Sequence, residues 1–186
     1  MSVSKNHRIF VALILTFTLS IPINLVAQPQ KTYSEYEVKI AFILNFLKFI
    51  EWPHDSTEKE RKTFNFYVIG YGPLCEALEA LDGKNVKGKT IIVKKIKKII
   101  EISEPDVVFV GQSEQNHIRD IVNVLKNRSV LTIGDTEGYA KNGIMINLYM
   151  EMRKVRFEIN VDAATKAKLR ISSRLLSLSR IIDHTP

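Results

Sequence analysis

The chain has 186 residues, of which 27 are basic and 20 acidic, and 45% of it is hydrophobic. This length suits one folded domain that buries a sizeable core. The excess of positive charge is modest. Together with the export signal described next, it excludes chromosomal DNA as a natural partner and predicts no nucleic-acid binding. Anionic headgroups, cell-wall polymers and an acidic protein face remain possible partners.

Residues 1–27 predict a secretory signal peptide. Lys5 and Arg8 precede an uncharged apolar run from Ile9 to Ile23, and the small residue Ala27 closes the segment. A membrane anchor is the alternative, but the run is short for a bilayer and polar residues follow it at once. We therefore expect export, cleavage near Ala27 and a mature domain of residues 28–186.

The hydrophobic pattern predicts a single α/β domain. Tyr33 to Ile50 reads as a helix, because apolar residues recur at helical spacing up to Trp52-Pro53. Predicted strands are Phe64–Ile69, Thr90–Val93, Val107–Val110, Ser129–Ile133, Ile144–Tyr149 and Val155–Ile159, and further predicted helices are Leu74–Leu81, 114–126 and Ile171–Ile182. This order favours a mixed β-sheet covered by helices, with Rossmann-like βα units followed by a C-terminal hairpin and helix.

The first helix carries two apolar faces that together nearly encircle it. One face holds Tyr36, Ile40, Ile43, Leu47 and Ile50, and the other holds Val38, Phe42, Phe46 and Phe49. One core does not need both faces. Either the helix is central and covered on all sides, or one face is reserved for a second subunit or partner, with Phe42, Phe46 and Phe49 as candidate contacts.

A short glycine motif, Gly70-Tyr71-Gly72, lies where a predicted strand meets a predicted helix. Dinucleotide-binding folds hold phosphate at this place on free backbone N–H groups. The third glycine of that fingerprint is absent, since Cys75 stands there, and Pro73 removes one donor. An ordinary turn is therefore favoured over an anion-binding turn.

No catalytic or metal-binding set is apparent. Beyond the leader, His54, His117 and His184 are isolated, with no spacing typical of metal ligands. There is no nucleophile elbow, and Ser172-Ser173 is better explained as helix-capping hydroxyls. The sequence thus predicts a protein without cofactor, metal or enzymatic activity, the alternative being a hydrolase with an unrecognised site.

Cys75 is the only cysteine, so the chain cannot form an intramolecular disulfide. A buried thiol is favoured over a bridge between two chains.

Seven lysines between Lys84 and Lys98 are interleaved with β-branched residues. They indicate an edge strand protected against aggregation or, alternatively, a surface for anionic lipid or an acidic partner.

Four co-linear segments form a recognisable pattern. They are Lys39–Phe46 running to Trp52-Pro53, Val130–Asp135 with Gly138-Tyr139-Ala140, Val155–Asn160, and Leu169–Leu176. Together they resemble the YfiR family of bacterial periplasmic proteins over nearly the whole mature chain. The resemblance implies a compact α/β domain, often dimeric, that represses a membrane-bound diguanylate cyclase. It also suggests disulfide control in some members, but here Pro105 precedes Asp106 where some relatives have cysteine.

Alternation along Val155–Asn160 places Arg156, Glu158 and Asn160 on one face of the predicted strand. With Asp135 they are candidates for a polar interaction surface, although a solvated strand face explains the pattern equally well.

These observations predict a periplasmic regulatory protein. We expect it to form a homodimer and to bind and repress a membrane-bound diguanylate cyclase, thereby controlling cyclic-di-GMP output. The alternative is a periplasmic binding module for a small or anionic ligand at the turn from Gly70 to Leu74, feeding a sensor kinase or an outer-membrane uptake system.

Overall fold

The computed structural model describes residues 33–53 and 61–182. The predicted signal peptide and its cleavage point lie outside these residues. In the described ranges, none of the helices combines the length and apolarity needed to cross a membrane.

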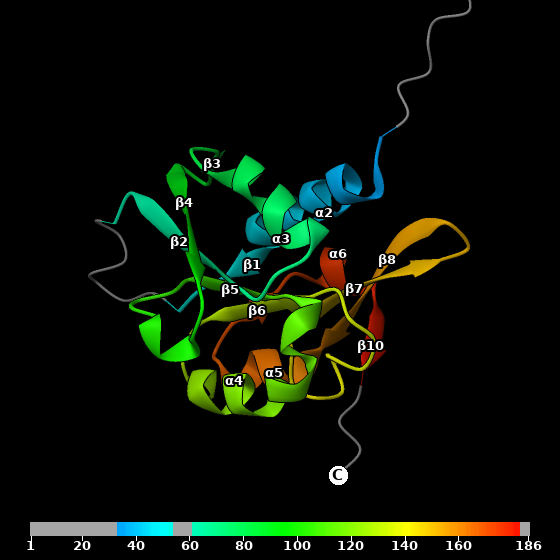
Figure 1. Ribbon diagram of the computed structural model, residues 1–186. Coiled ribbons are helices and arrows are strands. Elements are labelled where there is room, and N and C mark those ends of the chain that lie inside the picture. The colour runs from blue at the N-terminus through cyan, green and yellow to red at the C-terminus, as the bar shows by residue number, and fades with distance from the viewer. Residues whose placement is uncertain (1–32, 54–60, 183–186) are drawn as a thin grey trace, which may run out of the picture. The chain divides into compact units, whose positions relative to one another are not determined.

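A mixed eight-stranded sheet forms the centre of the domain (Figure 1). In spatial order its strands are β10 (Arg180–Ile182), β8 (Lys154–Asn160), β7 (Ile146–Glu151), β6 (Leu131–Gly134), β5 (Val107–Val110), β2 (Thr63–Ile69), β4 (Lys89–Ile96) and β3 (Asn85–Val86). Neighbouring strands run parallel except in the β7–β8 and β3–β4 pairs. A separate antiparallel pair joins β1 (Ile50–Glu51) to β9 (Arg170–Ile171). The predicted α/β fold class is confirmed.

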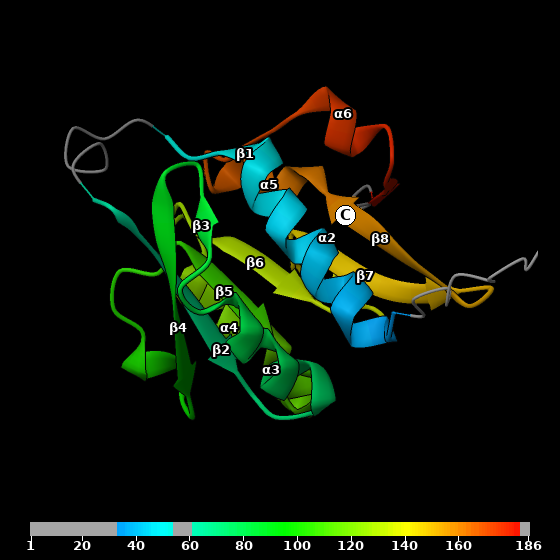
Figure 2. The ribbon, with the colours of Figure 1, turned by 90° about the horizontal axis from the view of Figure 1, so that it is seen from above.

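Helices cover both faces of this sheet. The α-helices are α2 (Glu35–Phe49), α3 (Pro73–Ala77), α4 (Ile118–Leu125), α5 (Val161–Lys166) and α6 (Ser173–Leu176), and the 3₁₀ turns are η1 (Leu78–Leu81), η2 (Ile99–Glu101) and η3 (Gln112–His117). Figure 1 shows α2 and α3 on one side of the sheet and α4 and α5 on the other. Seen from above, α2 lies across the part of the sheet that contains β7 and β8 (Figure 2).

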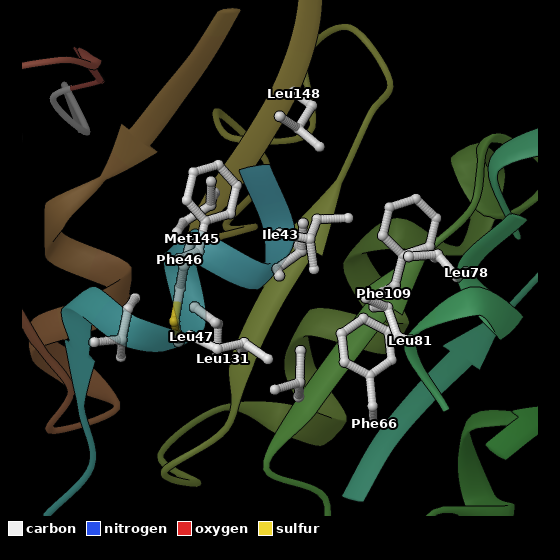
Figure 3. Packing of buried hydrophobic residues seen from close by; sticks show 14 of the residues in the cluster. Ile43, Phe46, Leu47, Phe66, Leu78, Leu81, Phe109, Leu131, Met145 and Leu148 are labelled. Atoms are coloured by element: carbon white, nitrogen blue, oxygen red, sulfur yellow. The ribbon is translucent and has the colours of Figure 1, made fainter. Parts of the chain in front are cut away.

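Strand alternation divides the core between the two faces. Phe66 and Phe109 pack with residues of α2, whereas Val108 and Ile121 belong to a second cluster on the α4 side. Figure 3 shows the first cluster, in which helical and strand side chains interlock. Because neighbouring strand residues point to opposite faces, continuously apolar strands such as β5 are buried on both sides.

A capping box formed by Ser34 and Glu37 marks the start of the first helix. The Ser34 hydroxyl accepts a hydrogen bond from the Glu37 backbone N–H at 3.2 Å, and the Glu37 carboxylate accepts one from the Ser34 N–H at 2.8 Å. This reciprocal capping box satisfies two backbone donors that the first turn leaves unpaired. The predicted helix of residues 33–50 is confirmed with slightly shorter bounds.

The predicted C-terminal helix of residues 171–182 is wrong. Only α6, one turn capped by Ser172, is helical, and the chain then enters β10 beside β8. The hydroxyls of Ser177 and Ser179 donate to backbone carbonyls of Arg174 and Leu176 at 3.0 and 2.9 Å. Such local hydrogen bonds compete with continuation of the helix. In β10 the backbone N–H and C=O groups pair with β8 instead.

Lys89, Lys94 and Lys95 of the lysine-rich segment lie in β4, and most of the outer edge of β4 is not paired with another strand. β3 pairs only with Lys89 and Thr90. Farther along, the Asp82 carboxylate accepts a hydrogen bond from the Val93 backbone N–H at 2.9 Å and occupies one edge position. The edge-strand prediction therefore agrees with the part of β4 that follows Ile91.

Candidate partner-binding site

A buried ammonium group joins the first helix to the end of β6. Lys39 is only 5% exposed, and its Nζ lies 2.7 Å from a Glu35 carboxylate oxygen and 3.1 Å from Asp135 Oδ2. Helical spacing of four residues brings Glu35 and Lys39 together, while the end of β6 presents Asp135. The pairing places two carboxylates around one cation and so balances a charge that the core would otherwise exclude.

Burial and pairing act on Lys39 in opposite directions. Burial lowers the pKa of Lys39, but the hydrogen bond to Glu35 and the charge of Asp135 outweigh it, so that the pKa is raised above its ordinary value. Lys39 is therefore a charged structural link between α2 and the sheet, with no tendency to act as a neutral base.

The structure places two of the predicted polar residues, Asp135 and Glu158, at the same end of β6. Asn147 Nδ2 donates to Glu158 Oε1 at 3.1 Å and to the Thr136 carbonyl at 3.0 Å, directly beside Asp135. The register of the strands explains this arrangement, because Gly134, Asn147 and Glu158 lie opposite one another on β6, β7 and β8. Asp135 and Glu158 thus border a single polar region at this end of β6.

The other two members of the predicted polar surface lie elsewhere. Arg156 is exposed and pairs with Glu151 near the hairpin turn, at 3.6 Å. Asn160 is 2% exposed, donates to the Ala140 carbonyl at 2.8 Å and accepts from the Ala163 N–H at 2.8 Å, which caps α5. The assignment of Asn160 to a recognition surface is therefore wrong, since both ends of its amide serve the fold.

Phe46 is also misassigned as a partner contact. It is 0% exposed and packs against Phe157 of β8, with ring centroids 5.0 Å apart. Phe42 lies against the same ring at 5.6 Å but is only partly buried. Phe49 is likewise partly buried, and the Arg174 guanidinium lies 5.9 Å from its ring centre. The second apolar face of α2 is thus divided between core and surface.

The exposed part of α2 forms a shallow groove of about 420 Å³. We call it the α2 groove, and it is lined by Tyr33, Glu37, Val38, Ala41, Phe42 and Asn45. Tyr33 is 57% exposed, and Ala41 is also exposed, so apolar surface faces outward along the first three turns. An outward apolar face beside a packed core is the feature that commonly marks a protein contact.

The glycine turn after β2 is packed by neighbouring protein atoms. The Ser113 hydroxyl accepts a hydrogen bond from the Tyr71 N–H at 2.9 Å, and a side chain at Gly70 would meet that hydroxyl at 2.6 Å. Ser113 in turn donates to a Glu114 carboxylate oxygen at 3.3 Å, which brings negative charge to the turn. Gly70, Tyr71 and Gly72 therefore have the contacts of an ordinary βα turn, and the adjacent carboxylate opposes anion binding.

Side chains also fill the crevice at the carboxyl ends of β2 and β5, where α/β sheets of this topology commonly bind ligands. Cys75 approaches Gly111 so closely that an added Cβ would lie 2.5 Å from the sulfur. Tyr139 donates to the Gly111 carbonyl at 2.8 Å from the other side. Both side chains are buried, so the crevice is part of the core.

Burial raises the pKa of the Cys75 thiol to about 11 from an ordinary value of 9.0, assisted by the negative charges of Asp135 and Glu76. We expect labelling of native Cys75 by iodoacetamide at pH 8 to be at least about a hundredfold slower than in the urea-unfolded chain, since only the thiolate reacts. Mass spectrometry over time measures both rates. Equal rates would place the thiol at the surface.

The same shift has a consequence for alkaline stability. Because the folded state holds the thiol proton more tightly, this contribution is complete below pH 9 and is lost as the pH rises through about 11. Cys75→Ala should cost no more than about 2 kcal/mol at neutral pH and should remove this alkaline component. Urea titrations at pH 7.5 and 10.5 compare the two proteins.

The aspartate that immediately precedes β5 and the tryptophan that follows the first helix have structural roles. Asp106 is 2% exposed, pairs with Arg61 and accepts a hydrogen bond from the Asn65 backbone N–H at 2.7 Å. The Trp52 indole N–H donates to the Asp106 carbonyl at 3.3 Å. These contacts fasten the end of the α2–β1 segment to the central strands.

In the part of the chain that the structure describes, no group of three or more histidine, cysteine, aspartate or glutamate side chains gathers to hold a metal ion.

The sequence did not predict that Lys39 and Asn147 belong to the polar region at the end of β6. A single lysine at the start of an apolar helical stretch was the available signal for Lys39, whereas Asn147 became apparent only through strand register.

The fold and site define an α/β domain with a mixed sheet covered on both faces. The profile of the YfiR/HmsC-like family matches residues 36–180, and the chain belongs to this family. The family is one of periplasmic regulatory proteins. A search among curated proteins finds no match.

Solved structures with a similar fold are distant in sequence. A conserved domain protein from Vibrio cholerae O1 biovar El Tor strain N16961 has a TM-score of 0.56 at 14% identity, covering 81% of this chain and 61% of that one. An ABC domain in complex with L-Trp from Streptococcus pneumoniae has a TM-score of 0.51 at 10% identity, covering 75% and 59%. This chain thus spans about three fifths of each, and the likeness concerns the fold alone.

Proposed function

We propose that this protein is exported to the periplasm, where it binds a membrane-bound diguanylate cyclase and holds it inactive. The observation that carries the proposal is the match of the YfiR/HmsC-like family over residues 36–180. Repression in this scheme is a binding equilibrium. The cyclase has an active and an inactive state, and a protein that binds the inactive state more tightly raises the population of that state. The size of the shift is set by the ratio of the two affinities.

The α2 groove is the surface that we assign to this contact. Its floor is apolar, it is open to solvent, and the Lys39 pair fixes the helix that carries it to the sheet. Phe42 supplies an aromatic side chain at the edge of the packed cluster. Partly buried aromatic residues held by a rigid support are typical anchors of protein interfaces.

Ala41→Arg tests this assignment. Ala41 is exposed on the groove, and arginine is nearly as favourable in a helix as alanine, so the fold should tolerate the change. The added bulk and charge should block an apolar contact, and we expect cellular cyclic-di-GMP to rise to the level of a strain lacking the protein. The melting temperature of the purified protein should stay within about 2 °C, as for a surface substitution.

Val124→Arg is the matched control, because Val124 is 46% exposed on α4, on the other side of the sheet. It should leave repression intact. Unchanged cyclic-di-GMP in the Ala41→Arg strain, with normal protein levels, would remove the α2 groove from the proposal. Unchanged cyclic-di-GMP on deletion of the whole protein would instead overturn the proposed function.

We also propose that the protein forms a homodimer. Light scattering on the purified wild type and Ala41→Arg proteins measures the mass of each. A dimer in both places the α2 groove outside the subunit interface. A monomeric Ala41→Arg protein would show that the groove contacts a second copy, and a monomeric wild type would contradict the dimer.

A further inference from the structure

A second concave surface lies between α4 and α5, formed by other elements than the α2 groove. It is a groove of about 330 Å³, which we call the α4–α5 groove. This volume is at the lower end of the range of small-molecule sites. α4 and α5 lie on the same side of the sheet in Figure 1.

The floor of the α4–α5 groove is largely apolar and has little unsatisfied polarity. Val122, Met145 and Ala167 contribute aliphatic surface. The buried Thr132 hydroxyl already accepts a hydrogen bond from the Met145 N–H at 2.9 Å, and both ends of the Asn160 amide are bonded within the protein. A ligand on this floor would therefore gain mainly from burial of its apolar part.

The rim, in contrast, is strongly basic. Four cationic side chains line the groove, those of Arg119, Lys126, Lys141 and Lys166, against the single carboxylate of Asp162. Within residues 33–53 and 61–182, the three lysines form no ion pair, and Arg119 only donates to Asn142 Oδ1 at 3.5 Å. What distinguishes this place is that four cationic side chains line one hollow together with a single carboxylate.

We propose that the α4–α5 groove binds a small amphipathic anion, with a phosphate or carboxylate group held by the rim lysines and a short apolar chain or ring on the floor. Mobile ammonium groups suit such a headgroup because each adds a charge-assisted hydrogen bond without fixing one geometry. The apolar floor selects against free inorganic anions. The site is independent of the proposed repression, and its ligand could come from solution or from a lipid.

Phenyl phosphate is a suitable probe, because it joins one ring to one phosphate. Isothermal titration of the mature protein should show that phenyl phosphate binds. Inorganic phosphate and phenol should each bind at least about tenfold more weakly, because the first lacks the apolar contacts and the second lacks the charged ones. The double variant Lys141→Gln and Lys166→Gln should lower the affinity for phenyl phosphate by about tenfold. The loss is no larger because both side chains are exposed and solvent screens their charges.

The matched control is the double variant Lys97→Gln and Lys98→Gln, which removes the same charge from exposed lysines outside the groove. It should change the affinity by less than about twofold. Equal weakening in both variants would overturn the site, as would inorganic phosphate binding as tightly as phenyl phosphate or no binding at all. Vesicles of phosphatidylglycerol identify the source: competition with the probe supports a lipid ligand, and its absence a soluble one.

Discussion

Phe46→Ala should destabilise the protein by about 3–5 kcal/mol, the cost of removing a large aromatic side chain from a closely packed core. Phe46 has no exposed surface and lies 5.0 Å from the Phe157 ring and 6.1 Å from the Phe42 ring, centre to centre. Truncation would leave a cavity where α2 meets β8, and the three-ring cluster would lose its most deeply buried member. Urea-induced unfolding of the purified variant measures the loss.

Phe42→Ala is the control for this prediction, because Phe42 belongs to the same cluster but is only partly buried. It should cost about 1–2 kcal/mol, in proportion to its smaller buried surface. A Phe46→Ala protein as stable as wild type would contradict the burial described above and return Phe46 to the interface. In cells, loss of repression by Phe46→Ala should accompany a lower protein level, which distinguishes unfolding from a lost contact.

Much of the fold could be predicted because strong local signals agreed with the tertiary structure. The apolar runs of β2, β5 and β6 are short, β-branched and buried, and Ser34 marks the start of the first helix. The C-terminal segment shows the limit of such reasoning. Its apolar spacing fits a helix, but pairing of β9 with β1 and of β10 with β8 decides the outcome, and these pairings join residues distant in sequence.

The candidate site could be predicted only in part for the same reason. The two-faced first helix indicated surplus apolar surface, but periodicity could not tell which aromatic residue meets β8. Asn160 was assigned by strand alternation to the polar face, yet it lies at the last position of β8, where its side chain turns to cap α5. Elements that meet only in the folded structure set both outcomes.

Lys39→Met should show how strongly the buried ion network holds α2 to the sheet. Methionine keeps the length and apolar stem of the side chain but leaves Asp135, whose side chain is 16% exposed, without its cation. We expect a loss of about 2 kcal/mol at pH 7, less than for a fully buried pair because both carboxylates retain some water. Urea titration measures it.

Lys48→Met is the matched control, since Lys48 is exposed on the same helix and donates a long hydrogen bond of 3.4 Å to Asn45 Oδ1. This substitution should cost less than about 0.5 kcal/mol. The pH dependence separates the charge from the packing. Because the folded pKa of Lys39 is raised, its contribution is complete below the ordinary value of 10.5 and is lost as the pH rises through the folded pKa. The stability difference between wild type and Lys39→Met should therefore be constant from pH 7 to 9 and shrink above 10.5. A difference that persists unchanged at higher pH would show that the methylene stem of Lys39, and not its charge, fastens α2 to the end of β6.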